Sequence, residues 1–154
     1  DSVRQVMSDL RPPLLDDYGL YKALEWHARQ FELRTGLHVS VDGDALQRRF
    51  APEVEMALFR VAQEALTNVA KHAAASQARV ALTADGARVR LVIEDDGRGI
   101  DPLPGANDRS HAGWGMAIMR ERAEAVGGAM RVERTPGGTK LIVEAAANDP
   151  DPTG

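Results

Sequence analysis

The chain contains no cysteine, no long hydrophobic run and no excess of positive charge. Without cysteine, disulfide bonds and thiolate metal sites are excluded, and the absence fits a cytosolic protein. No apolar stretch approaches the roughly 20 residues that a membrane-spanning helix needs, and no signal-peptide pattern opens the chain. We therefore expect a cytoplasmic domain without direct membrane contact, which leaves open whether a longer parent protein is anchored in a membrane.

Positive charge is also too scarce for a nucleic-acid partner to be expected. The formal net charge is -4 at pH 7, whereas nucleic-acid-binding surfaces usually show a clustered basic excess. The composition, with 44% hydrophobic and 27% charged residues, is ordinary for a soluble globular domain. A length of 154 residues leaves room for one domain with a single core.

Hydrophobic periodicity and breaker residues predict a mixture of helices and strands. Strands are predicted at Leu37–Val41, Gln77–Thr83, Arg88–Asp95, Ala129–Arg134 and Thr139–Ala145. Helices are predicted at Asp1–Leu10, Leu20–Thr35, Pro52–Ala73 and Trp114–Val126. Because short turns such as Asp85-Gly86 join neighbouring strands as hairpins, we expect an α+β fold. Helices would cover one face of a mixed, mostly antiparallel sheet, which gives a two-layer α/β sandwich.

Three segments are expected to lie outside these elements. Pro12-Pro13 ends the first helix, and Leu14–Tyr18 is then predicted to be a connector. The segment Asp96–Ala112 is rich in Gly, Pro, Asn and Asp, and loops of this length are often lids over a site. The polar residues after Ala147 are predicted to be a frayed end or the start of a linker.

A carboxylate lies at the junction between a strand and a glycine-rich loop. Residues two apart share a face of a strand, so Asp95 is in phase with the apolar Leu91 and Ile93. Burying a carboxylate there is costly unless a hydrogen-bond donor meets it, and Gly97 and Gly99 let a ligand approach the backbone. The pattern predicts a ligand with a donor group at the strand end. The alternative is an Asp that only begins a tight turn.

The longest predicted helix carries a polar stripe beside its apolar one. Glu64, Asn68 and the pair Lys71/His72 follow one another at spacings of three and four, which places them on one side of the helix. Asn has a poor helix propensity, and its amide oxygen is a neutral ligand that suits Mg²⁺. Lys71 and His72, one turn further, would pair with phosphate oxygens. The alternative is a solvated helix face with a hydrogen bond between Glu64 and Asn68.

A third group of residues surrounds the end of the loop and the last strand. Gly113 and Gly115 precede Met116 at the start of a helix, whose free N–H groups and positive dipole end attract phosphate. A flexible hinge is the alternative for these glycines. Thr139 opens the last strand in phase with its inward-facing residues, so its hydroxyl could join Asp95 in a small polar floor. Equally, Thr139 could be only a strand residue.

The order of these groups resembles the ATP-binding signature of the GHKL superfamily, whose domain is the Bergerat ATP-binding fold. The resembling segments are Glu64-x-x-x-Asn68, Asp95-x-Gly97-x-Gly99, Gly113-x-Gly115 and Gly138-Thr139. Within that superfamily, further segments resemble sensor histidine kinases that partner LuxR-type response regulators. These segments are Leu10–Leu20, Arg60–Ala73 and Met116–Ala123.

The resemblance implies a site for ATP and Mg²⁺ with a role for each matching residue. Asp95 would accept a hydrogen bond from the adenine amine, and Asn68 would hold the Mg²⁺ that bridges the phosphates. Glu64 would support the metal or its water and would act with Asn68 in catalysis, orienting or deprotonating the accepting imidazole. The remaining positions implied for ATP are Lys71, His72, Gly113, Gly115 and Met116 at the phosphates, and Gly97, Gly99, Ile100 and Thr139 around adenine.

The implied function is donation of the γ-phosphoryl group of ATP to a histidine on a dimerisation domain, with a LuxR-type response regulator downstream. In this family an acidic residue closely follows the accepting histidine. The histidines of this chain, which all lack that context, are His27, His38, His72 and His111. The acceptor is therefore expected outside this chain. The implied organisation is the tail of a dimerisation helix at 1–12, the ATP-binding catalytic domain at 13–147 and a flexible tail at 148–154.

Two other functions stay open at this point. One is a nucleotide-binding module without catalysis, such as an ATP-sensing domain, although Glu64 and Asn68 favour catalysis because a pure binder needs no metal ligand there. The other is an anti-sigma-factor serine kinase of the same superfamily, against which the Leu10–Leu20 segment argues. A gyrase-like ATPase is not expected, because the transducer domain that it needs is missing.

Overall fold

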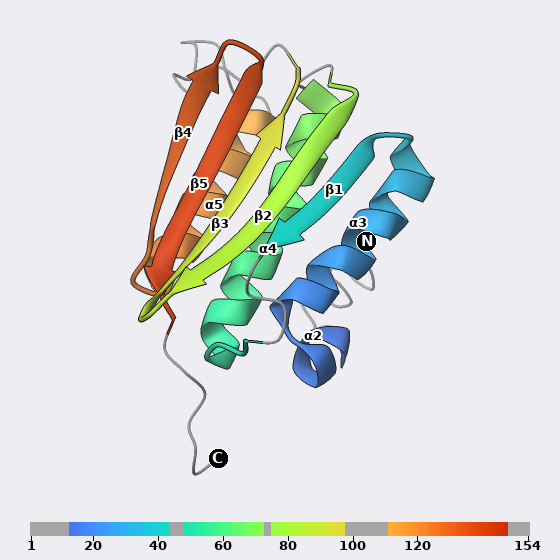
Figure 1. Ribbon diagram of the computed structural model, residues 1–154. Coiled ribbons are helices and arrows are strands. Elements are labelled where there is room, and N and C mark those ends of the chain that lie inside the picture. The colour runs from blue at the N-terminus through green and yellow to red at the C-terminus, as the bar shows by residue number, and fades with distance from the viewer. Residues whose placement is uncertain (1–12, 44–47, 73–74, 98–110, 148–154) are drawn as a thin grey trace.

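In the part of the chain that the structure describes, five strands form one sheet in the order β1-β2-β3-β5-β4, with the helices on one face (Figure 1). The strands are β1 (His38–Gly43), β2 (Gln77–Asp85), β3 (Arg88–Asp95), β4 (Ala129–Thr135) and β5 (Gly138–Ala146). Strand β1 pairs with β2 in parallel, and the other neighbours pair antiparallel. The predicted two-layer α+β architecture is confirmed.

The computed structural model describes residues 13–43, 48–72, 75–97 and 111–147, and at residues 72 and 111–114 only the backbone. Its helices are α2 (Pro13–Tyr18), α3 (Leu20–Thr35), α4 (Pro52–His72) and α5 (His111–Ala125). None of these described helices is both long and apolar enough to cross a membrane. The predicted helix at residues 1–10, the lid segment 98–110 and the tail 148–154 lie outside the described residues.

Helix α4 organises the core, because it contacts α3, α5 and the strands β2, β3 and β5. Pro52 suits the first position of a helix, and Glu53 and Glu55 in the first turn favour its positive dipole end. The predicted apolar stripe is buried throughout: Val54, Leu58, Val61, Ala62, Ala65, Leu66 and Val69. Burial of each larger member stabilises the fold by about 1.5–3 kcal/mol.

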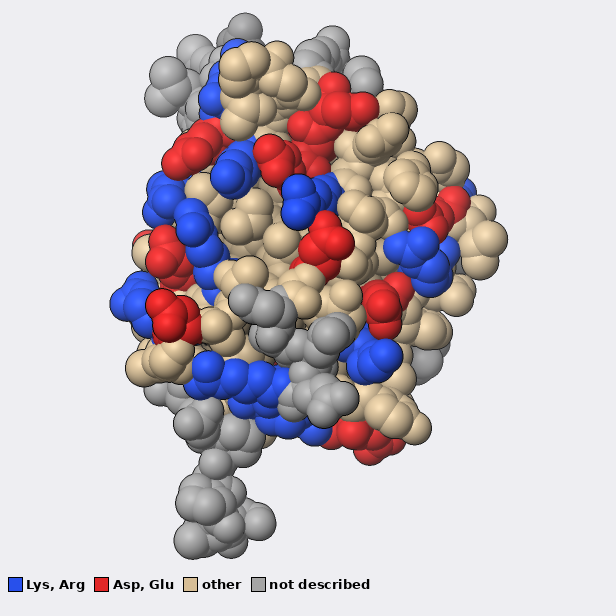
Figure 2. All heavy atoms as spheres, in the orientation of Figure 1, with Lys and Arg blue, Asp and Glu red and all other residues tan. Residues whose placement is uncertain are grey.

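Alternate residues of the central strands point toward the helices. In β3 the buried positions are Val89, Leu91, Ile93 and Asp95, with less buried residues between them. This alternation is the one expected for a sheet with one covered face. On the opposite face, acidic and basic side chains are interspersed (Figure 2) and form ion pairs such as Arg79–Asp42 at 2.8 Å and Arg131–Glu144 at 3.2 Å.

The predicted connector Leu14–Tyr18 is wrong, because these residues belong to helix α2. Pro13 is a favourable first residue for a helix, and Leu15 is fully buried within the core. The Gly19 N–H donates to the Leu15 carbonyl at 3.1 Å and completes the turn before α3 begins. The prediction failed because a six-residue helix is stabilised by tertiary burial rather than by its own periodicity.

An ion pair fastens α2 to the start of α4. The Arg49 Nε donates to Glu55 Oε2 at 3.0 Å, and its Nη2 donates to Glu55 Oε1 at 3.1 Å and to the Asp16 carbonyl at 3.0 Å. Glu55 is fully buried. A Cβ on Gly19 would lie 2.8 Å from Arg49 Cδ, and Gly19 has a φ of 91°, so a side chain there would disturb both the backbone and the ion pair.

Helix α3 has the predicted bounds, and Gly36 ends it in the left-handed conformation at a φ of 79°. Helix α5 begins at His111, three residues before the predicted start at Trp114. Glycine disfavours a helix interior by about 1 kcal/mol, which is why the helix was predicted to begin only after Gly113.

Candidate functional site

Asp95 lies at the end of β3 with its carboxylate on the covered face of the sheet. The residue is only 7% exposed, and its Oδ1 accepts a hydrogen bond from the Gly97 N–H at 2.9 Å. Burial raises the pKa of the Asp95 carboxyl, Asp96 and Glu94 raise this pKa further, and the Gly97 bond lowers it. The Gly97 bond is the one that the tight-turn alternative expects, but a turn does not require a buried carboxylate, so the burial favours an additional role in ligand binding.

The neighbouring carboxylate, Asp96, has a different role, which the sequence analysis did not identify. Its Oδ1 accepts from the Ser76 N–H at 2.9 Å and from the Gln77 N–H at 3.0 Å, and its Oδ2 accepts from the Ser76 hydroxyl at 2.8 Å. The bond from Gln77, followed by those from Ser76, lowers the pKa of Asp96. Asp96 therefore fastens the end of β3 to the start of β2 and holds Asp95 in place.

Thr139 faces Asp95 across the sheet, because the two residues are partners in the antiparallel pairing of β3 with β5. Thr139 is 4% exposed, and its Oγ1 has no hydrogen-bond partner among the described residues. A Cβ on the preceding Gly138 would lie 1.8 Å from the Asp95 carbonyl oxygen, and Gly138 has a φ of 154°. Only glycine allows β5 to approach Asp95 this closely.

Asn68 is buried on α4, with 3% of its surface exposed, and its Nδ2 has no partner in the described part of the chain. The alternative of a solvated helix face with a Glu64–Asn68 hydrogen bond is therefore wrong, since only Nδ2 could donate that bond. Buried polar atoms in native proteins are nearly always paired. An orphaned amide here indicates a place for a ligand, an ion or an ordered water.

Asn68, Asp95 and Thr139 line one small cavity. Its volume is about 20 Å³, which is room for about one water molecule. The other lining residues are Ala65, Val69, Ile93, Met116, Met119 and Leu141. Two orphaned polar atoms and a buried carboxylate thus share an otherwise apolar pocket between α4, α5, β3 and β5. The convergence of a few polar groups in an apolar lining is typical of small-molecule sites, which are much larger than this closed cavity.

The start of α5 lies against the polar stripe of α4. A Cβ on Gly115 would lie 2.5 Å from Glu64 Oε1, 3.0 Å from Asn68 Nδ2 and 3.3 Å from Asn68 Oδ1. Glu64 Oε1 and both terminal atoms of the Asn68 amide therefore lie beside the Gly115 backbone. No group of three or more His, Asp or Glu side chains that could hold a metal occurs among the described residues. A carboxylate and an amide oxygen nevertheless fit Mg²⁺, which usually takes one or two protein oxygens.

Apart from Met116, none of the other predicted site residues that the structure describes lines this cavity. Gly97 adjoins Asp95, and Lys71 is exposed at the end of α4, outside the cavity. Gly113 and His72 are described only in their backbone, inside α5 and α4. Gly99 and Ile100 lie outside the described residues. Because α5 begins at His111, the N–H of Gly115 lies beyond the first four residues of the helix and is not one of its free donors.

The apolar walls of the cavity were not predicted as site residues. They are Ala65, Val69, Ile93, Met119 and Leu141. The sequence did show that these residues share a face with predicted site residues, since Ala65 and Val69 flank Asn68 on α4 and Ile93 is two residues before Asp95. That signal indicates burial in any core, and it could not separate a ligand-facing residue from an ordinary core residue.

Comparison with known proteins gives consistent results. The family described as "Histidine kinase-, DNA gyrase B-, and HSP90-like ATPase" matches residues 53–148. Sensor histidine kinase MctS of Rhizobium johnstonii is 38% identical over 151 residues, which are 96% of this chain and 32% of that protein. Signal transduction histidine-protein kinase/phosphatase DegS of Brevibacillus brevis is 35% identical over 142 residues, covering 92% and 36%. The chain thus spans about a third of these curated relatives.

Solved structures share the fold. The histidine kinase domain of the blue-light activated histidine kinase from Erythrobacter litoralis EL346 superposes with a TM-score of 0.64 at 24% identity, covering 83% of this chain and 61% of that one. The catalytic domain of histidine kinase ThkA superposes with a TM-score of 0.62 at 14% identity, covering 84% and 92%. At these identities the likeness concerns the arrangement of strands and helices.

Proposed function

Because this chain belongs to the histidine kinase-, DNA gyrase B- and HSP90-like ATPase family, we propose that it is the ATP-binding catalytic domain of a sensor histidine kinase. It would donate the γ-phosphoryl group of Mg-ATP to a histidine on a dimerisation domain. The supporting observation is the cavity in which the buried Asp95 carboxylate meets the unpartnered Asn68 and Thr139 side chains. Its relatives MctS and DegS are named as histidine kinases.

The adenine end of the proposed site is built on Asp95 and Thr139. The Asp95 carboxylate accepts a hydrogen bond from the exocyclic amine of adenine, which repays the cost of burying the carboxylate. The Thr139 hydroxyl, directly across the sheet, bonds the same edge of the base through a water molecule. Gly97 donates its N–H to Asp95 Oδ1, and the other carboxylate oxygen would accept from adenine.

The phosphate end is built on Asn68 and Glu64, whose oxygens lie beside Gly115. These two residues would hold Mg²⁺, which supplies neutralisation of charge on the phosphates during transfer. Lys71 and His72 would approach the outer phosphates from the end of α4. Glu64 would orient the accepting imidazole once a dimerisation domain docks. The protein's contribution is then mainly positioning, which can supply much of the acceleration of a phosphoryl transfer.

Nucleotide entry requires α5 to move. A cavity of about 20 Å³ cannot hold a purine, and the Gly115 backbone fills the space beside Glu64 and Asn68. Met116 and Met119 lie on α5, whereas Asp95 and Thr139 lie on the sheet. A shift of α5 away from α4 would therefore open the cavity between them without disturbing the adenine-binding strands.

The proposed partners follow from the same assignment. The segments Arg60–Ala73 and Met116–Ala123 favour a parent kinase that signals to a LuxR-type response regulator. The phosphoacceptor domain, the regulator and a cytoplasmic location all remain part of this proposal, as do the boundaries 1–12, 13–147 and 148–154. No nucleic acid and no direct membrane contact are expected for the domain.

The test is phosphoryl transfer from γ-labelled ATP and Mg²⁺ to a separately supplied dimerisation domain of the parent kinase. We expect acid-labile label on that domain, which is typical of phosphohistidine, and none when Asn68→Ala replaces the wild-type chain. Binding of ATP without transfer would support the non-catalytic ATP-sensing alternative instead. Acid-stable label on a serine of a partner protein would support the anti-sigma-factor kinase alternative.

A further inference from the structure

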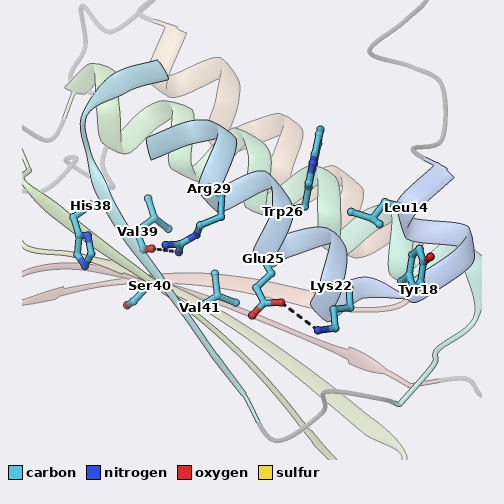
Figure 3. Close-up of a pocket in the computed structure, with 10 residues that line it drawn as sticks. All are labelled: Leu14, Tyr18, Lys22, Glu25, Trp26, Arg29, His38, Val39, Ser40 and Val41. Carbon is cyan, nitrogen blue, oxygen red and sulfur yellow. Dashed lines mark hydrogen bonds and ion pairs between the residues drawn. The ribbon is translucent and has the colours of Figure 1, made fainter. Parts of the chain in front are cut away.

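The sheet has two outer edges, and side chains cover one of them far more than the other. At the β1 edge, Arg29 of α3 donates to the Val39 carbonyl (Figure 3), and the Val39 N–H donates to Glu32 Oε2 at 2.7 Å. The Tyr21 hydroxyl donates to the Val41 carbonyl at 3.3 Å. Side chains that bond the main chain of an edge strand prevent another strand from pairing with it. The β1 edge is therefore closed.

The second edge is formed by β4, which lies on the outside of the sheet in Figure 1. Within residues 13–43, 48–72, 75–97 and 111–147, β4 pairs only with β5. Arg120 Nη1 of α5 donates to the Met130 carbonyl at 3.1 Å, so this carbonyl points away from β5. Because main-chain groups alternate in direction along a strand, the N–H and C=O of Val132 also point away from β5. The outer edge of β4 is therefore directed to accept a further strand.

Apolar surface lies beside this edge. A depression of about 270 Å³ between α5 and β4 is lined by Met116, Arg120, Met130, Arg131 and Val132. Met116 and Val132 are only partly buried. An edge strand next to apolar side chains favours pairing with another chain, because the added strand would cover both. Of these lining residues, only Met116 also lines the cavity at Asp95.

The charges on the solvent-facing side of β4 are arranged symmetrically about Val132. Arg131 precedes Val132 and Glu133 follows it, and the two exposed side chains lie 3.1 Å apart. If two copies of β4 paired antiparallel about a two-fold axis at Val132, Arg131 would face the partner's Glu133, and the four charges would alternate in sign. An axis at Arg131 or at Glu133 would instead oppose like charges. The pattern therefore specifies one register and favours a second copy of this chain as the partner.

We propose that two copies of the domain pair through β4 in this register and join their five-stranded sheets into one. The Val132 residues of the two copies would exchange main-chain hydrogen bonds. Arg120 would release the Met130 carbonyl, which would then face the partner strand. Because the β1 edges are closed, pairing would stop at a dimer. The pairing uses no residue assigned to ATP, so it does not depend on the proposed function.

This pairing is expected to be weak in the isolated domain. Strand β4 has seven residues, and small interfaces are typically transient, so we expect a dissociation constant of about 0.1 mM. In a parent kinase that dimerises through another domain, tethering would hold the two copies at a local concentration of about a millimolar, which is enough for them to pair. This consequence, unlike the pairing itself, rests on the proposed function.

Sedimentation equilibrium of the full chain up to about 1 mM tests the register. Glu133→Arg opposes like charges at both symmetric positions and should raise the dissociation constant about tenfold. Adding Arg131→Glu to this variant exchanges the two signs and should return the constant to within about threefold of the wild type. Asp85→Arg, the same change of charge at an exposed position of β2, should have no effect. A monomer at every concentration, or a double variant no tighter than Glu133→Arg, would overturn the proposal.

Arg120 provides a second test with the opposite sign. Arg120→Met removes the bond to the Met130 carbonyl and should lower the dissociation constant about threefold. Arg122→Met, at an exposed position of α5 outside the depression, should leave it unchanged. Amide exchange of Val132 should slow as the dimer forms, whereas that of Arg131, whose N–H points to β5, should not. Weaker association of Arg120→Met, or Val132 exchange independent of concentration, would overturn the proposal whatever the outcome of the ATP experiments.

Discussion

Gly115 of α5 lies directly against Asn68 of α4: a Cβ on Gly115 would be 3.0 Å from Asn68 Nδ2. The same Cβ would be 2.5 Å from Glu64 Oε1. The two helices can therefore meet over the polar stripe only because residue 115 lacks a side chain. In this arrangement the backbone of α5 occupies the space in which the metal and phosphates of a nucleotide would lie.

Gly115→Ala should strengthen binding of Mg-ATP by up to about tenfold, or about 1.4 kcal/mol. The added methyl group would clash with the Glu64 carboxylate while α5 lies against α4, so it would disfavour the closed arrangement that excludes the nucleotide. Gly137→Ala is the matched control, because a Cβ there meets no atom within 4 Å. Titration calorimetry of both variants with Mg-ATP provides the measurement. Equal affinities for the two would contradict the proposed movement of α5 on nucleotide entry.

Asp95→Asn should reduce ATP affinity by at least about 100-fold, or about 2.7 kcal/mol. The amide would turn a donor toward the adenine amine, leaving two donors opposed. The folded state should not lose stability, because the neutral amide avoids the cost of burying a charge. Asp42→Asn is the control: it removes an exposed carboxylate that pairs with Arg79 on the solvent-facing side of the sheet and should retain ATP affinity. Wild-type affinity in Asp95→Asn would refute adenine recognition by this residue.

Thr139→Val should lower ATP affinity while it raises the stability of the folded protein. The hydroxyl has no partner among the described residues, so its replacement by a methyl group of similar shape should raise the free energy of unfolding by up to about 1 kcal/mol. ATP affinity should nevertheless fall, because the water-mediated contact with adenine is lost. Urea unfolding of the nucleotide-free protein and calorimetry with ATP measure the two effects. A loss of stability with unchanged affinity would make Thr139 a structural residue only.

Arg49→Met should lower the free energy of unfolding by about 3 kcal/mol, because it leaves the buried Glu55 carboxylate without its ion pair. ATP affinity should not change in the folded protein, since the pair fastens α2 to α4 away from the cavity. Arg131→Met, which removes ion pairs on the solvent-facing side of the sheet, should lower the free energy of unfolding far less, because water screens exposed charges. Urea unfolding compares the two, and similar losses would show that the Arg49–Glu55 pair has no special structural role.

The stability of the domain should decline as the pH falls from about 6.5 toward 4. Burial, followed by repulsion from Arg34, lowers the pKa of His27 to about 4, and the ring packs against Phe31 and Phe59. The unfolded chain therefore binds a proton at a higher pH than the folded chain, which favours unfolding across this range. The loss is on the order of 3 kcal/mol when complete.

His27→Gln should make the free energy of unfolding less dependent on pH in this range, because it removes the titrating ring. Asp95 has the opposite effect on the slope, since its raised pKa makes the folded chain bind a proton more readily as the pH falls. Comparing His27→Gln with the wild type isolates the histidine contribution. Parallel profiles for the two proteins between pH 6.5 and 4 would exclude His27 as the cause.

Much of the secondary structure could be predicted because its signals are local. The phase of Leu91, Ile93 and Asp95 is a property of a strand whatever lies around it. The same holds for the bounds of α3, where Gly36 takes a conformation that other residues avoid. Helix α2 was predicted wrongly, because the burial of Leu15 depends on partners distant in sequence, and the start of α5 was predicted three residues late.

The sequence by itself determined which polar groups the domain contains, their order along the chain and their phase on each element. Only the tertiary structure decided that Asn68, Asp95 and Thr139 share one cavity and that Asn68 is buried rather than solvated. The physical reason is that periodicity specifies the direction of a side chain relative to its own helix or strand. Burial and an unpartnered amide arise only when α4, α5, β3 and β5 pack together and exclude water from the space between them.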